Sequence, residues 1–286
     1  MPMTLIQGYF DVIQANPDGD SIRFYPNNPE LWQKLPRRVR INSSGGAQLR
    51  IDSIDSLEMH YSPQGGRLSQ QHQPLDLANA AAEELLKFLG FEKITRSLDG
   101  VVIEAEPKKV PGFILTQSSD NYGRSIAFVF KGESDGVDGS DAFLNTTLIK
   151  QTANYHLLAQ GLAYPTFYRK LFPSLRKELF AAVQEARFQN KGIWQLDKTN
   201  EGFCLENLET LTHEAVILPK LFRRISNYIS VNNGKVNLQG FIDFIKFQNE
   251  KAIVLPENKV MALDTIIEVD GQNIKLTKAP EYLLFF

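Results

Sequence analysis

The segment Leu49-Arg50-Ile51-Asp52-Ser53-Ile54-Asp55-Ser56-Leu57-Glu58 changes character partway along its length. Residues 47–54 alternate apolar and polar side chains, a pattern typical of a half-buried β-strand. Strict alternation would place Arg50 and Asp55 on opposite faces, so the strand must end or bend between them if both serve one site. For this segment alone, a solvated strand end with surface charges is the commoner explanation of Asp55, Ser56 and Glu58.

Further strands and three helices are predicted around this segment. Turn residues at 16–19 separate two stretches rich in Val, Ile, Phe and Tyr, and the same composition recurs later in the chain. Pro74 and Gly90 mark the two ends of an alanine- and leucine-rich helix. The strands are expected at 8–15, 20–26, 47–54, 100–106, 111–117 and 124–131, and the helices at 75–90, 143–161 and 174–190.

Composition places the chain among ordinary globular proteins. It has 286 residues, of which 43% are hydrophobic and 22% charged, and a formal net charge of −2 argues against a broadly basic surface for nucleic acid. The single cysteine, Cys204, cannot form an intrachain disulfide. No apolar stretch reaches the roughly 18 residues of a membrane helix, so no membrane partner is expected. The first residues lack the basic start and apolar run of a signal peptide. We therefore expect a cytoplasmic protein, with secretion after processing left open.

Two other short motifs carry chemistry-bearing residues. Asp20 follows Asp18-Gly19 at a strand mouth, where its carboxylate could bind a hard cation. Arg124 ends the segment Asp120-Asn121-Tyr122-Gly123-Arg124, and its guanidinium could grip a phosphate with two hydrogen bonds. Each motif alone is more commonly a simple turn with exposed charges.

In this order, however, the motifs DGDS, LRIDSIDSLE and DNYGR resemble the thermonuclease (staphylococcal nuclease-like) family, with its DGDT, RxxxxDTPE and DKYGR. Residues 154–163, NYHLLAQGLA, and the helix that ends in Lys191-Gly-Ile-Trp194 resemble later parts of that family. The resemblance covers residues 8–194. It implies a mainly β fold with α-helices, an OB-like five-stranded β-barrel carrying three helices.

The resemblance also implies a role for each residue that matches a family motif. Asp20 and Asp55 would be calcium carboxylates, and Ser56 would offer the same Ca²⁺ ion its main-chain carbonyl. Arg50 and Arg124 would hold the scissile phosphate, and Glu58 would orient or deprotonate the attacking water. Substrate contacts would come from Tyr122, Asn121 and Tyr168.

The chain departs from the family motifs at three positions. Leu57 replaces a proline, Ser56 replaces a threonine, and Asn121 replaces a lysine near the phosphates. The first change could loosen the loop, and the last removes one positive charge. The change at Ser56 hardly matters if the ligand is the main-chain oxygen.

These residues favour a calcium-dependent nuclease that hydrolyses phosphodiester bonds of DNA or RNA. By resemblance it would show little sequence preference and leave 3′-phosphate ends. Two alternatives stay open at this point. The first is a non-catalytic module on the same barrel that binds nucleic acid or protein. The second is an unrelated OB-fold protein whose motif matches arise by chance.

The composition changes near residue 198, where we expect a domain boundary. Residues 1–198 would form the nuclease domain, and residues 199–286 a small C-terminal α+β domain of unknown role. Residues 200–230 are expected to be mainly helical, and the pattern from 235 onward is strand-like. Val269-Asp270-Gly271-Gln272 predicts a hairpin turn. Self-association through this domain, extension of the substrate groove and plain stabilisation are all open.

Overall fold

The computed structural model describes residues 2–286, which divide into two compact units. The first unit runs up to Asp52 and resumes from Ala81 to Leu157. The second unit consists of Ser53–Ala80 and Leu158–Phe286. Each unit is described by itself.

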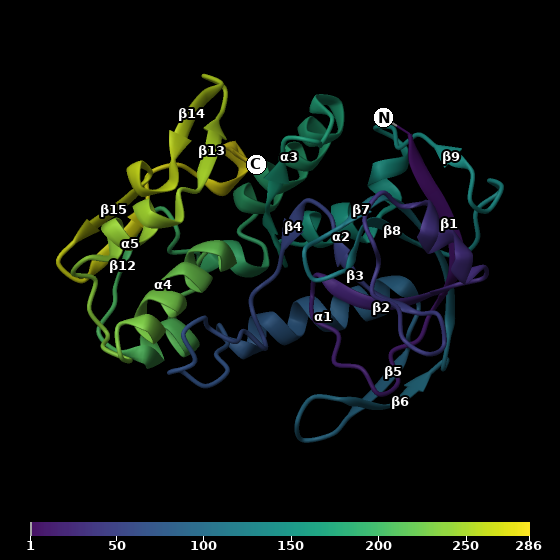
Figure 1. Ribbon diagram of the computed structural model, residues 1–286, viewed down its shortest axis with the longest axis horizontal. Coiled ribbons are helices and arrows are strands. Elements are labelled where there is room, and N and C mark those ends of the chain that lie inside the picture. Colours follow the sequence, from purple (N-terminus) through teal and green to yellow (C-terminus); the bar gives the residue numbers. More distant parts are fainter. Residues whose placement is uncertain (1) are drawn as a thin grey trace. The chain divides into compact units, whose positions relative to one another are not determined.

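A closed five-stranded β-barrel forms the first unit (Figure 1). Strand β1 pairs with both β2 and β7, and β3 lies between β2 and β8. All of these pairings are antiparallel except that of β3 with β8, which is parallel. The OB-like barrel expected from the sequence is therefore confirmed. Its strands are β1 (Met3–Phe10), β2 (Ser21–Pro26), β3 (Ala47–Ile51), β7 (Val110–Ser119) and β8 (Ser125–Lys131).

Strand β1 can pair on both sides because glycines lie where the backbones crowd. Gly8 is opposite both Pro26 and Gly112. A Cβ atom on Gly8 would come within 2.0 Å of the Tyr25 carbonyl oxygen, and one on Gly112 within 2.2 Å of the Phe10 ring. A side chain at either position would therefore push strands of the barrel apart.

Alternating apolar residues fill the barrel core. Phe10, Ile22, Phe24, Leu49 and Ile51 are all fully buried. Burying a side chain of this size contributes roughly 1.5–3 kcal/mol. The alternation seen in residues 47–51 thus reflects a strand with one face in the core, as predicted.

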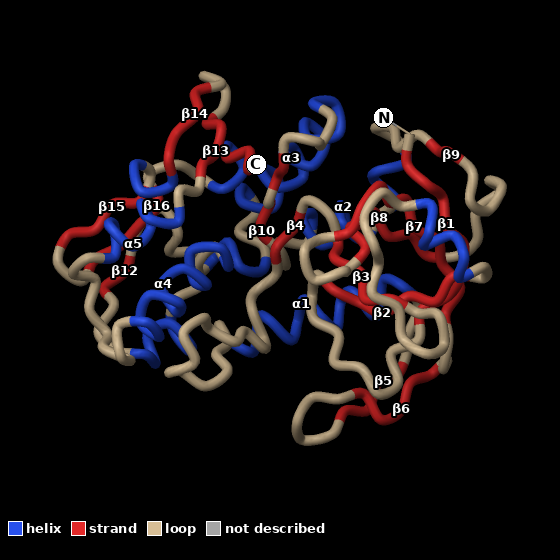
Figure 2. The backbone as a smooth tube through the Cα atoms, in the orientation of Figure 1, coloured by secondary structure: helices blue, strands red, loops and turns tan. Residues whose placement is uncertain are grey.

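Two strand predictions were wrong in detail. The first strand was expected at 8–15, but β1 ends at Phe10, and the next residues form a turn in which the Asp11 carboxylate accepts the Ile13 N–H at 3.1 Å. Residues 102–106 (β6, Val102–Glu106) do form a strand, but outside the barrel. They pair with β5 (Lys93–Arg96) in a separate hairpin that extends away from the barrel strands (Figure 2). Strand β5 lacks a fully buried side chain, so its sequence does not show the apolar alternation that predicts a strand.

Helix α1 (Leu75–Leu89) begins in the second unit and continues into the first. It ends as predicted at Gly90, whose φ of +112° is easy only for glycine. The second helix is shorter than the predicted 143–161, because Thr152 adopts an extended conformation between η2 (Leu148–Gln151) and α2 (Ala153–Ala159). The Thr152 hydroxyl then accepts the Tyr155 N–H at 3.1 Å and caps α2.

The second unit contains the remaining helices. The predicted helix 174–190 is present as α3 (Pro173–Phe188), followed by η3 (Gly192–Gln195). Residues 200–230 hold the short η4 (Thr210–Glu214) and the longer α4 (Pro219–Val231). Helix α5 (Phe241–Gln248) lies where a strand-like pattern was predicted, because Phe241 and Ile245 are both buried four residues apart.

Three small sheets complete the second unit, which thus contains both helices and strands. The predicted hairpin at 269–272 is present between β15 and β16. The first sheet pairs β4 (Ile54–Asp55) with β10 (Tyr164–Pro165). The second has the order β11 (Phe167–Tyr168), β17 (Leu283–Phe285), β13 (Lys251–Val254) and β14 (Lys259–Ala262). The third has the order β12 (Phe203–Cys204), β16 (Asn273–Leu276) and β15 (Ile267–Asp270).

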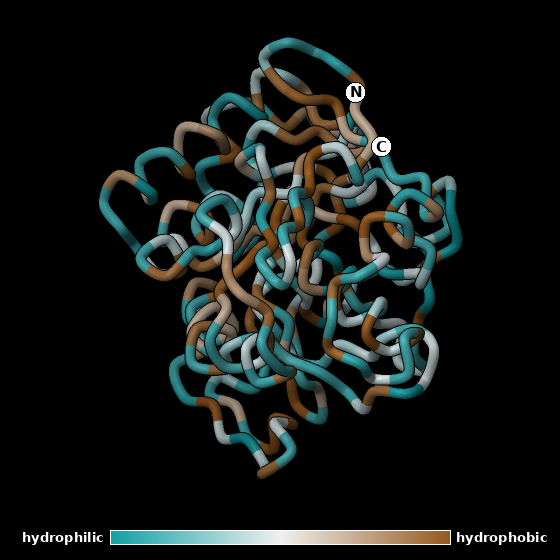
Figure 3. The backbone as a smooth tube through the Cα atoms, turned by 90° about the vertical axis from the view of Figure 1, so that its left-hand side faces the viewer, coloured by the Kyte–Doolittle hydropathy of each residue, from teal (hydrophilic) through white to brown (hydrophobic). Residues whose placement is uncertain are grey.

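Hydrophobic residues occur along the chain in short stretches that hydrophilic residues interrupt (Figure 3). Accordingly, none of the helices within residues 2–286 has the length and apolar character needed to span a bilayer.

Candidate functional site

Asp20 and Arg50 meet where β2 begins and β3 ends. Ser21 lies opposite Arg50 in the β2–β3 register. An Arg50 terminal nitrogen lies 2.7 Å from an Asp20 carboxylate oxygen, and both side chains are largely buried. The Asp18 carboxylate accepts the Asp20 N–H at 3.2 Å and shapes the preceding turn. The structure therefore brings together two of the predicted site residues of the first unit.

Arg124 is held in place by Asp120, four residues earlier in the β7–β8 hairpin. One oxygen of the Asp120 carboxylate accepts the backbone N–H groups of Tyr122 and Arg124, both at 2.9 Å. The other oxygen accepts the Arg124 Nε–H at 2.7 Å. The same carboxylate thus closes the turn and sets the direction of the guanidinium. The spacing of Asp120 and Arg124 was in the sequence motif, but this role of Asp120 was not predicted.

The chain bends between Arg50 and Asp55. Strand β3 ends at Ile51, and Ser53 has a φ of +66°, in the left-handed region. The next two residues form β4, where Asp55 lies opposite Tyr164. Asp55 and Ser56 are both buried.

The loop that carries Glu58 is fixed by a buried glutamine. Gln73 is fully buried, its backbone N–H donates to the Glu58 carbonyl at 2.8 Å, and its side-chain oxygen accepts the Glu58 N–H at 3.2 Å. Its side-chain amide also donates to the Ile217 carbonyl at 2.8 Å. Gln73 therefore fixes the backbone of the segment that follows Asp55.

Arg223 binds the two acidic side chains that were predicted as site residues in the second unit, Asp55 and Glu58. It lies on α4, and its two terminal nitrogens donate to the two oxygens of Asp55 at 3.1 Å and 2.8 Å. One of these nitrogens also donates to Glu58. Nothing in the sequence marked Arg223, which reads as an ordinary charged residue of an amphipathic helix.

Burial and charge act in opposite directions on this arginine. Burial lowers the pKa of Arg223, but the carboxylates of Asp55 and Glu58 together raise it by more. The net pKa therefore lies well above the ordinary value. Arg223 is therefore charged throughout the physiological pH range. Asp55, which is only 1% exposed, therefore lies beside a charged guanidinium.

The resemblance assigns calcium to carboxylate and carbonyl oxygens, and Arg223 engages those of the Asp55 side chain. Carboxylate and carbonyl oxygens suit Ca²⁺. Yet both oxygens of Asp55 accept hydrogen bonds from Arg223, and Glu58 binds the same guanidinium. Within residues 2–286, no group of three or more His, Cys, Asp or Glu side chains is placed to hold a metal ion. In this arrangement Arg223 engages the Asp55 oxygens that a calcium ion would need.

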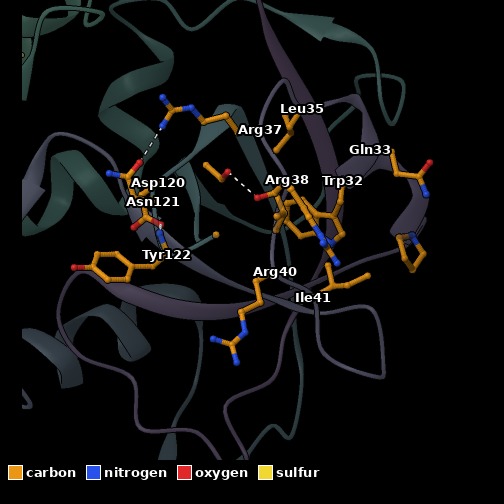
Figure 4. Close-up of a pocket in the computed structure, with 14 residues that line it drawn as sticks. Trp32, Gln33, Leu35, Arg37, Arg38, Arg40, Ile41, Asp120, Asn121 and Tyr122 are labelled. Atoms are coloured by element: carbon orange, nitrogen blue, oxygen red, sulfur yellow. Dashed lines mark hydrogen bonds between the residues drawn. The ribbon is translucent and has the colours of Figure 1, made fainter.

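A hollow of about 840 Å³ lies beside the β7–β8 hairpin (Figure 4). It contains two of the predicted substrate contacts, Asn121 and Tyr122, together with arginines from residues 37–40. The Asn121 side-chain oxygen accepts from Arg37 at 3.3 Å, and the Tyr122 side chain is 76% exposed. The third predicted contact, Tyr168, lies in β11 of the second unit, with its ring 6.1 Å from that of Phe285.

Residues 100–196 match the family model described as staphylococcal nuclease homologue. The chain carries a staphylococcal nuclease-like domain. The matched part of this nuclease-like domain includes Arg124, Tyr122 and Tyr168, whereas Asp20 and Asp55 precede it. No curated protein matches the chain.

Proposed function

We propose that the nuclease-like domain hydrolyses phosphodiester bonds of DNA or RNA and that this activity depends on calcium. The observation that carries the proposal is the placement of Arg124. It sits on the hairpin where the family resemblance expects a phosphate-binding arginine, with Asp120 fixing its guanidinium. The ion pair of Asp20 and Arg50 adds a second arginine of the expected type.

The proposed chemistry follows from the charge of the substrate. A phosphodiester is anionic, and its hydrolysis adds charge at phosphorus in the transition state. Arg50 and Arg124 are proposed to neutralise that charge, usually the largest single catalytic effect. Glu58 is proposed to orient or deprotonate the attacking water. By resemblance the products would carry 3′-phosphates.

Calcium dependence would require that the ligand oxygens of Asp55 become available to the ion. Asp20, Asp55 and the Ser56 carbonyl are the residues that the resemblance assigns to Ca²⁺, an ion whose charge would assist phosphate hydrolysis. Because Arg223 engages both oxygens of Asp55, calcium binding there requires that Arg223 first release the carboxylate. The proposal therefore includes this release.

A second candidate function is a non-catalytic module that binds nucleic acid. The ion pairs of Arg223 favour it, because they engage the two carboxylates assigned to the metal and the water. If these pairs are permanent, the barrel keeps a phosphate-binding surface without a reaction centre.

One experiment separates the two functions. Cleavage of labelled single-stranded DNA and RNA is measured with calcium and with a chelator for the wild type, Glu58→Gln and Arg124→Ala. We expect calcium-dependent cleavage by the wild type and a loss of at least about 10²-fold in both variants, as for other single transition-state contacts. Lys87→Ala, on an exposed part of α1, is the control and should match the wild type. Binding without cleavage under all conditions would support the second function.

Three further expectations stay predictions. A boundary near residue 198 is tested by limited proteolysis, and self-association through residues 199–286 by sedimentation at several protein concentrations. A cytoplasmic location is tested by cell fractionation.

A further inference from the structure

Residues 29–41 consist of a short 3-10 helix, η1 (Pro29–Lys34), and a loop after it that is fixed to the β7–β8 hairpin. The Arg40 N–H donates to the Gly123 carbonyl at 2.8 Å, and the Ser119 hydroxyl donates to the Arg38 carbonyl at 3.0 Å. In η1, the buried Trp32 donates its indole N–H to the Gly45 carbonyl at 3.0 Å. These contacts hold the backbone, so the arginines of the loop start from fixed points beside the hairpin.

The side chains on this loop form a basic groove. Arg37, Arg38 and Arg40 are all exposed, and they line the hollow of about 840 Å³ (Figure 4). A second hollow of about 480 Å³ is lined by Arg23, Arg40 and Arg124. Arg40, Ile41, Tyr122 and Gly123 line both hollows, which therefore adjoin one another.

Acidic residues are nearly absent from this groove. Among the described residues that line the two hollows, only Asp120 is acidic, and its carboxylate is engaged with Arg124. The whole chain has a net charge of −2, so five arginines in adjoining hollows are a local concentration of positive charge. A polyanion would be attracted to this surface rather than to the chain as a whole.

We propose that the basic groove, defined by Arg23, Arg37, Arg38, Arg40, Tyr122 and Arg124, binds a single strand of DNA or RNA along several consecutive phosphates. The substrate class rests on the proposed function. The groove extends the contact beyond the phosphate at Arg124, and Arg37, Arg38 and Arg40 neutralise neighbouring phosphates. The exposed ring of Tyr122 offers a base a stacking surface.

The exposed tyrosine favours a single strand over a duplex. In a duplex the bases are stacked on one another and their flat faces are not available to a side chain. In a single strand every base has a free face, and stacking on an aromatic ring is worth roughly 1–3 kcal/mol per base. The groove thus combines the two features of sequence-tolerant strand binding, a row of cations and an exposed aromatic ring.

Binding is tested without cleavage. Fluorescence anisotropy with DNA and RNA oligonucleotides of about 12 nucleotides is measured in a chelator at several salt concentrations, for the wild type and R37A/R38A/R40A. We expect affinity to fall at least about 10-fold. The slope of log affinity against log salt should fall by about 2 in magnitude, since each single-strand phosphate contact contributes about 0.7. Tyr122→Ala should weaken binding without changing this slope.

A matched triple variant controls for the loss of charge. K87A/K93A/K108A removes three exposed cations from other parts of the first unit and should bind as the wild type does. The proposal would be overturned if both triple variants lost oligonucleotide affinity equally. It would also be overturned if R37A/R38A/R40A bound as tightly as the wild type. Equal binding of polyglutamate and oligonucleotide would also overturn it, because the surface would then recognise charge alone. Comparing the DNA and RNA arms shows which strand the groove prefers.

Failure of this inference is distinguishable from failure of the proposed function. A small chromogenic phosphodiester occupies a single phosphate position, so its cleavage by the wild type measures hydrolysis without requiring that the groove bind a strand. If the wild type binds strands through the groove but cleaves neither substrate, the proposed hydrolysis is refuted and the proposed strand binding is supported. A wild type that cleaves the small substrate but binds no oligonucleotide would refute the groove alone.

Discussion

Arg223 and Asp55 are 168 positions apart in the sequence and form a two-point ion pair, with contacts of 2.8 Å and 3.1 Å. The carboxylate is buried and the guanidinium side chain is 23% exposed. Two charges in such a place stabilise the fold only while both are present. The pair therefore links α4 to a residue that the family resemblance assigns to the metal.

Replacing Arg223 with alanine should destabilise the protein strongly. Asp55 would lose its two-point partner in a buried position, and the loss of one member of such a pair costs about 3–5 kcal/mol. Urea unfolding in a chelator measures the change. Arg224→Ala is the control, because Lys220 stays 3.0 Å from the Glu250 partner that Arg224 would leave, so the loss should be smaller.

Calcium should partly restore the Arg223→Ala variant if the cation and the guanidinium share Asp55. A ligand that binds only the folded state raises the free energy of unfolding. We therefore expect calcium to stabilise Arg223→Ala more than the wild type in the same unfolding experiment. Equal effects on the two proteins would argue against calcium at Asp55.

Asp120 should act as a positioning residue for Arg124. Asp120→Ala removes the acceptor of the Arg124 Nε–H and of two turn N–H groups. We expect kcat to fall by about 10-fold or more with little change in KM, since a misdirected contact weakens the transition state most. Steady-state kinetics with Lys87→Ala, at an exposed position outside the groove, as control tests this. A rise in KM alone would show that Asp120 serves substrate binding instead.

Asn154 should be a major contributor to the stability of the barrel. It is fully buried, accepts the Val129 N–H at 3.0 Å, and donates to the carbonyls of Asp52 at 2.8 Å and Ala127 at 3.2 Å. Asn154→Ala leaves buried polar groups unsatisfied and should cost roughly 2–4 kcal/mol. Thermal and urea unfolding measure the loss. Thr147→Ala, at an exposed position without a capping bond, should cost far less.

Glu250 should make stability depend on acid pH. Burial raises the pKa of Glu250, but Arg224 and Lys220 lower it by more, so the net pKa is below the ordinary value. The unfolded chain then takes up the proton first as the pH falls, so the stabilisation is present above about pH 4.3 and is lost as pH falls through the folded-state pKa. Unfolding free energies between pH 3 and 7 should converge for the wild type and Glu250→Gln at the acid end. Glu206→Gln, at an exposed position, should track the wild type throughout.

Several single elements could be predicted because their signals are local, whereas the barrel was expected from the family resemblance. Alternation in residues 47–51, Gly90 after α1 and the turn at 269–272 all depend on neighbours a few positions away. Helix α5 was missed because its buried pair, Phe241 and Ile245, also fits a strand-like pattern of apolar residues. The family resemblance, rather than spacing alone, indicated Arg124.

The contacts of the site could not be predicted in the same way. Arg223 is found at Asp55 only because α4 packs in one particular orientation, and that orientation depends on long-range contacts. Gln73 fixes Glu58 through a hydrogen bond to Ile217, 144 positions away. Such partners are set by the packed fold and leave no mark on the residues that flank them.

The position of β17 has a consequence for the order in which the protein is made. This strand, residues 283–285, lies between β11 and β13 in its sheet. Both neighbours are synthesised earlier, so they lack their pairing partner until β17 has left the ribosome. The barrel strands, by contrast, are complete by residue 131. We expect a nascent chain stalled before β17 to protect its barrel from protease, while β11 stays open to cleavage until synthesis has passed Phe285.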